Sequence, residues 1–125
     1  IHLSVSAVIE RIRKMEETGV IKEYTIIVDE KKTGNEMTAL MEVSLEHPKF
    51  FDSFADAIQK LEYIVSCYYQ TGDFDLIIRI SCHSSDELEE IHRQVMSLPG
   101  VDATRTHVVL KNVKNIYSAI RRPDK

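Results

Sequence analysis

Apolar residues near the start of the chain recur at helical spacing and form one stripe: Val5, Val8, Ile9, Ile12 and Met15. Ser4 or Ser6 can cap this predicted helix, which we expect to run to about Thr18, with Gly19 ending it. The opposite face is polar and charged. The helix is therefore amphipathic, but no partner helix for its apolar stripe follows nearby in the sequence.

Beyond this helix, short apolar segments alternate between strand and helix periods. We expect a strand at 21–28 and a polar loop at 29–36, then strand 37–45, helix 50–61, strand 64–70, strand 74–82, a helix from Ser84 or Ser85 to Leu98, and strand 101–113. Ser84 and Glu87 form a capping box, and Pro99-Gly100 ends the second of these helices. The order from 37 to 113 is βαββαβ. It predicts an α+β, ferredoxin-like fold with both helices on one face of a four-stranded antiparallel sheet.

The other face of this sheet has no helix to cover it, so its residues indicate what it meets. Alternation in the third strand places Phe74, Leu76, Ile78 and Ile80 on one face, and Asp73, Asp75, Ile77, Arg79 and Ser81 on the other. This second set is mixed rather than uniformly polar, and Leu40 and Val108 are also apolar positions on mixed faces. We therefore expect a second subunit to cover the open face.

Composition narrows the class of protein. The chain has 125 residues, 43% hydrophobic and 29% charged, with a net charge of −4, which suits one globular domain and not a polybasic nucleic-acid binder. Its two cysteines form no metal-binding pattern, so we expect buried thiols in a reducing compartment, no metal and no cofactor. Neither a membrane span nor a signal peptide is predicted, so a cytoplasmic location without membrane contact is expected.

Three stretches together resemble the Lrp/AsnC (feast/famine) family of amino-acid-responsive transcription regulators. They are LSVSAVIERIRKMEETGVIKEYTIIVD, QTGDFDLIIRI and SLPGVDATRTHVVLKNVK, and the resemblance covers nearly the whole chain in order. It implies a helix-turn-helix part for DNA, followed by a RAM domain of the dimeric α+β barrel type that binds effectors and assembles subunits. By this resemblance, 1–19 is a remnant of the helix-turn-helix, 20–36 a linker strand and loop, 37–114 the RAM domain and 115–125 a tail.

The family pattern has two helices before the one that begins near Ser4, and they are absent here. We therefore expect a fragment, a truncated product or a natural short form, with weak or no sequence-specific DNA binding. Residues 1–25 hold four basic and four acidic side chains, which favours no strong attraction to phosphate. In an intact parent, the residues expected to meet DNA are Ser4, Ser6, Arg11, Arg13 and Lys14. The alternative for this chain is a solvated helix face.

The segment Thr71-Gly72-Asp73-Phe74-Asp75 has three interpretations. Turn chemistry explains Gly72, through a positive φ, and Asp73, through bonds to the local backbone. It leaves Asp75 unexplained, because that residue is expected inside the strand on the same face as Asp73. A catalytic or metal pair lacks further ligands nearby.

The favoured interpretation is an effector site for a free amino acid, which is a zwitterion. Backbone N–H groups around Gly72 can receive the carboxylate, and Asp73 or Asp75 can receive the ammonium group. The resemblance places the effector near this hairpin, between dimers. The expected site residues are Tyr69, Thr71, Gly72, Asp73 and Asp75.

These observations predict a regulator rather than an enzyme. Its expected partners are a free amino acid, a second copy in a homodimer that assembles further into a tetramer or octamer, and DNA in the intact parent. Two alternatives stay open: a small ferredoxin-like dimeric enzyme such as a monooxygenase, or a headless partner that modulates full-length regulators. The single Glu89-x-x-His92 pair is more typical of a solvated helix face than of a di-iron site.

Overall fold

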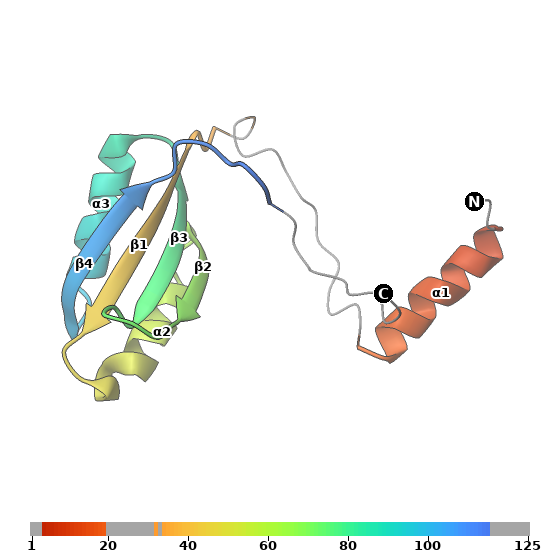
Figure 1. Ribbon diagram of the computed structural model, residues 1–125, viewed down its shortest axis with the longest axis horizontal. Coiled ribbons are helices and arrows are strands. Elements are labelled where there is room, and N and C mark those ends of the chain that lie inside the picture. Colours follow the sequence, from red (N-terminus) through yellow and green to blue (C-terminus); the bar gives the residue numbers. More distant parts are fainter. Residues whose placement is uncertain (1–3, 20–31, 33, 116–125) are drawn as a thin grey trace.

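The computed structural model describes residues 4–19, 32 and 34–115 (Figure 1). The first helix, α1 (Val5–Glu17), is capped by Ser4, whose hydroxyl oxygen accepts a hydrogen bond from the Ala7 amide at 3.2 Å. This confirms the predicted helix. None of its residues is buried, and Val5 is 76% exposed. The predicted strand at 21–28 and the tail beyond 115 lie outside the described residues.

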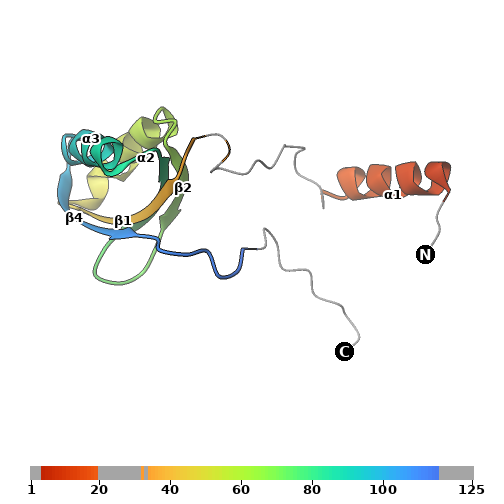
Figure 2. The ribbon, with the colours of Figure 1, turned by 90° about the horizontal axis from the view of Figure 1, so that it is seen from above.

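Residues 37–108 form a single sheet with two helices on one side (Figures 1 and 2). In chain order the elements are β1 (Met37–Leu45), a 3-10 turn η1 (Pro48–Phe50), α2 (Phe51–Gln59), β2 (Ile64–Tyr69), β3 (Leu76–Cys82), α3 (Ser85–Met96) and β4 (Val101–Val108). The strands lie in the order β2-β3-β1-β4, and every neighbouring pair is antiparallel. The predicted α+β, ferredoxin-like arrangement is confirmed.

The hydrophobic core lies between the sheet and the two helices. Alternate residues of β1 and β3 point into it, as do the inner faces of α2 and α3. Its buried members are Ala39, Met41, Val43, Phe54, Ile58, Leu76, Ile78, Ile80, Cys82, Ile91 and Val95. Each large aliphatic side chain buried in this way contributes roughly 1.5–3 kcal/mol. The periods of two in the strands and about 3.6 in the helices thus determine which side chains meet.

Local signals at the ends of α3 act much as predicted. The Ser84 hydroxyl oxygen accepts a hydrogen bond from the Glu87 amide at 3.3 Å, and the Glu87 carboxylate accepts one from the His83 amide at 3.2 Å. The return bond therefore reaches one residue further back than in the usual capping box. After the helix, Gly100 has a φ of +84°, and a Cβ there would collide with the Phe50 ring. Only glycine fits this connection.

Three expectations about strand ends and faces were wrong. β3 begins at Leu76 rather than at 74. Phe74 lies on the open face, where its ring packs against the Arg105 guanidinium. β4 ends at Val108 rather than at 113, although the next amide, that of Val109, still donates to the Thr38 carbonyl of β1 at 2.8 Å. Val108 pairs directly with the buried Ala39 and so faces the helices, unlike Leu40 on the open face.

Candidate functional site

Residues 71–75 form the loop between β2 and β3. The Gln70 amide donates to the Asp75 carbonyl at 2.9 Å and closes the base of the loop. The loop folds across the open face of the sheet (Figure 2). Gly72 has a φ of +121°, as predicted, and a Cβ at this position would meet nothing within 4 Å. Thr71, Gly72 and Asp73 are exposed, so their polar groups are accessible to a ligand.

Asp75 is bonded to β1 through both its backbone and its side chain. Its amide donates to the Val43 carbonyl at 3.0 Å, and its carboxylate oxygen Oδ2 accepts from the Leu45 amide at 2.8 Å. The carboxylate therefore satisfies a backbone donor at the end of β1, next to the register shift at Ser44 and Leu45. The expectation that Asp75 lies inside the strand and shares a face with Asp73 was wrong, because the residue precedes β3 and turns toward β1.

Tyr69 lies on the helix side of the sheet, opposite the buried Leu76. Its ring meets the Phe51 ring edge to face, with centroids 4.8 Å apart. Leu45, Pro48, Phe51, Tyr69 and Asp75 line a small open cavity of about 60 Å³. Small-molecule sites usually have roughly 300–1,000 Å³. One chain therefore brings Tyr69 and Asp75 together but encloses too little space there to hold a small molecule.

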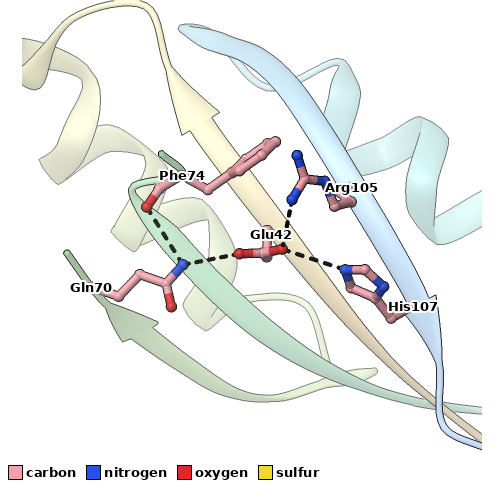
Figure 3. Close-up of polar contacts among 5 residues, drawn as sticks. All are labelled: Glu42, Gln70, Phe74, Arg105 and His107. Atoms are coloured by element: carbon pink, nitrogen blue, oxygen red, sulfur yellow. Dashed lines mark hydrogen bonds and ion pairs between the residues drawn. The ribbon is translucent and has the colours of Figure 1, made fainter. Parts of the chain in front are cut away.

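A second polar cluster lies on the open face and was not predicted (Figure 3). Its centre is Glu42, whose side chain is 22% exposed. The Glu42 carboxylate accepts from Gln70 Nε2 at 3.3 Å and lies 3.8 Å from Arg105 Nη1 and 3.4 Å from His107 Nε2. Arg105 in turn stacks over the Phe74 ring, 4.7 Å from its centroid.

A signal for this cluster is present in the sequence of β1. Glu42 is the only charged residue in MTALMEVSL, at a position that alternates with buried ones. Its partners come from β4 and from the end of β2, so their proximity depends on strand register. That register is set by tertiary pairing, which explains why the cluster was missed.

The residues expected to meet DNA are all exposed on or beside α1. Ser4 caps the helix and contacts Ser6 through their hydroxyl groups at 3.3 Å. Arg13 pairs with Glu10 one turn earlier, at 2.7 Å from Nη2 to Oε1. Arg11 and Lys14 are the other exposed cations of this set.

The remaining candidates for chemistry are scattered. Glu89 pairs with Arg93 at 2.6 Å, whereas His92 contacts the Thr104 hydroxyl at 3.1 Å, so the Glu89-x-x-His92 pair does not converge on one site. Cys82 is buried as expected, but Cys67 is exposed, so the expectation of two buried thiols was wrong for Cys67. Partial burial raises the pKa of both thiols. In the described part of the chain, no group of three or more His, Cys, Asp or Glu residues could hold a metal ion. No helix in that part is long and apolar enough to cross a membrane.

Comparison with known proteins identifies the family. A sequence model described as the Lrp/AsnC ligand binding domain matches residues 38–118. The chain belongs to the Lrp/AsnC family. The matched range includes β1 from Thr38 onward, the 71–75 loop and all of β4, so the loop and the cluster around Glu42 both lie within the domain by which the family is recognised.

Relatives in the Lrp/AsnC family are named as transcriptional regulators. The chain is 38% identical over 112 residues to the HTH-type transcriptional regulator FL11 of Pyrococcus horikoshii, covering 90% of this chain and 74% of the relative. It is 32% identical over 115 residues to the leucine-responsive regulatory protein of Escherichia coli, covering 90% and 70%.

A solved structure supports the fold assignment. A Neisseria meningitidis transcriptional regulator, determined in complex with L-methionine, superposes with a TM-score of 0.86. It is 22% identical, and the match covers 94% of this chain and 78% of that one. At this identity the likeness concerns the fold.

Proposed function

We propose that this chain is the effector-binding and assembly part of an amino-acid-responsive transcriptional regulator, and that the 71–75 loop receives a free amino acid where subunits meet. Membership of the Lrp/AsnC family supports the class of function. The observation that carries the site is the combination of exposed loop groups at 71–73 with a cavity of about 60 Å³ beside Tyr69 and Asp75. A second surface must complete such a cavity before it can enclose a side chain.

The two aspartates have different roles in this proposal. The carboxylate of Asp75 already accepts from the Leu45 amide, so Asp75 holds the loop in place. Asp73 is exposed and supplies the negative charge for the ammonium group of the effector. The backbone around Thr71 and Gly72 supplies N–H donors for its carboxylate. Tyr69 supplies part of the apolar wall for its side chain.

Assembly follows from the open face in this proposal. Leu40 and Ile77 are half-buried there, and Tyr68 is 65% exposed, so the face carries apolar surface that a second copy would cover. Contacts between such dimers build the tetramer or octamer and complete the effector site. The exposed apolar stripe of α1, with Ile9 60% exposed, belongs to the DNA-binding part of the regulator. We assign the chain a binding role in the cytoplasm and no catalytic one.

The test is calorimetric titration with the proteinogenic amino acids, L-leucine and L-methionine first, while light scattering follows the mass of the assembly. We expect at least one amino acid to bind and to change that mass, because an effector can shift assembly only if it prefers one state. If none binds and the mass stays constant, the proposed function is wrong.

A matched pair of variants locates the site. Asp73→Asn removes the charge proposed to meet the ammonium group and should weaken binding by about tenfold or more. Asp86→Asn removes another exposed carboxylate, in the first turn of α3, and should leave the affinity unchanged. Equal effects of the two variants would move the site away from the loop.

A further inference from the structure

Four contacts form a closed ring around the base of the 71–75 loop (Figure 3). Glu42 accepts from Gln70 Nε2 at 3.3 Å, and the same Nε2 lies 3.5 Å from the Phe74 carbonyl oxygen. The Phe74 ring lies under the Arg105 guanidinium, and Arg105 returns to Glu42 at 3.8 Å. These four contacts join both ends of the loop to Glu42 on β1 and to Arg105 on β4.

The position of Glu42 in β1 gives this ring its importance. Val43 and Leu45, one and three residues further along the strand, hold Asp75 through its amide and its carboxylate. One short stretch of β1 therefore holds the loop at both ends. Its backbone holds Asp75 at one end, and the Glu42 side chain holds Gln70 at the other.

The ion pair between Glu42 and Arg105 differs from the exposed ion pairs of the chain in how far its carboxylate is buried. Its side chain is 22% exposed, whereas that of Glu89, in the Glu89–Arg93 pair on α3, is 64% exposed. Partly buried charges are screened less by salt and solvent, so their geometry has a larger energetic effect. The Glu42 carboxylate also has Arg105, His107 and Gln70 around it.

We propose that Glu42 is a positioning residue that couples the 71–75 loop to the open face of the sheet. A change in the loop that displaces Gln70 or Phe74 alters their contacts with Glu42 and Arg105. Arg105 and His107 lie on the face where a second copy would pack. This inference rests on the proposed function, because it explains how effector binding reaches the subunit contact. Such coupling is reciprocal, so assembly also orders the loop.

The first test needs no effector. Amide hydrogen exchange of Glu42→Ala should be faster than in the unmodified chain at Gln70 and Asp75, by about fivefold or more for each hydrogen bond lost. Glu42→Gln keeps an acceptor for Gln70 and should rescue part of this protection. Glu89→Ala breaks an ion pair outside the ring and should leave exchange in the loop unchanged. Unchanged exchange in Glu42→Ala overturns the proposal.

A second control distinguishes the effect of these four contacts on the loop from the effect of the subunit contact. Leu40→Ala removes an apolar side chain from the same face of β1 without touching the ring. If Leu40→Ala loosens the loop as much as Glu42→Ala does, the loop is held by the partner subunit and the proposal is overturned. Circular dichroism should confirm that all four variants keep the fold.

The third test measures coupling with L-leucine and L-methionine as probes. We expect a change in assembled mass on binding in the unmodified chain, and a change reduced by about fivefold or more in Glu42→Ala. An undiminished response in that variant overturns the coupling. If the unmodified chain binds neither probe nor any other amino acid, the proposed function fails, and the positioning role is then decided by hydrogen exchange alone.

Discussion

The two faces of the sheet use the same strands for different purposes. On the helix side, β1 and β3 contribute a continuous apolar surface that α2 and α3 bury. On the open side, the same strands carry half-buried apolar residues around a charged centre at Glu42. Because side chains alternate along a strand, one face of the same strand stabilises the fold, and the other is available to hold a loop and to meet a partner.

The largest expected effect contrasts two adjacent isoleucines. Ile78 is fully buried against the helices, and Ile78→Ala should lower the free energy of unfolding by about 2–5 kcal/mol. Ile77 is half-buried on the open face, and Ile77→Ala should lower the free energy of unfolding by only about 1 kcal/mol in dilute solution. Denaturant unfolding measures both values.

A concentration series sharpens this contrast. If a second copy covers the open face, the cost of Ile77→Ala should rise with protein concentration, because association stabilises the folded chain. The cost of Ile78→Ala should change much less. Equal costs in dilute solution would contradict the distinction between the two faces.

A smaller effect distinguishes the two aspartates of the loop. Asp75→Ala leaves the Leu45 amide without its acceptor and should lower the free energy of unfolding by about 1–3 kcal/mol. Asp73→Ala affects an exposed side chain and should stay within about 0.5 kcal/mol. Thermal and denaturant unfolding of both variants provide the comparison, and a larger loss at Asp73 would reverse the roles assigned to them.

The smallest effect concerns the thiols on the helix side. Burial raises the pKa of Cys67, so at pH 8 a smaller fraction is thiolate and iodoacetamide should react more slowly than with free cysteine. The difference should shrink as the pH rises through the raised pKa. Cys82 is fully buried and should react only after unfolding. Mass spectrometry of the labelled peptides measures both, and rapid native labelling of Cys82 would contradict its place in the core.

Much of the fold was predictable because its signals are local. The stripe of α3, its Ser84 cap and its Pro99-Gly100 end are within reach of one another along the chain. The alternation of Ala39, Met41 and Val43 likewise identifies their buried face before any partner strand is known. The βαββαβ order then follows, since few arrangements bury all these faces together.

The candidate site was predictable only in part. Gly72 was expected at a positive φ, and the structure confirms it, because turn chemistry is local. Phe74 was expected on the core face, but Arg105, 31 positions later in the chain, holds its ring on the other side. The remaining site residues were chosen by resemblance to a family, and their role in binding stays a prediction.

The order of the elements from β1 to β4, the buried faces of β1, α2 and α3 and the resemblance to the Lrp/AsnC family could all be read from the sequence. What Asp75 and Glu42 contact became known from the folded chain alone. Both carboxylates find their partners through strand pairing, Asp75 at Leu45 and Glu42 at Arg105 and His107. A periodic pattern states which face a side chain takes, whereas its neighbours across a sheet depend on register, and register is decided when the whole sheet assembles.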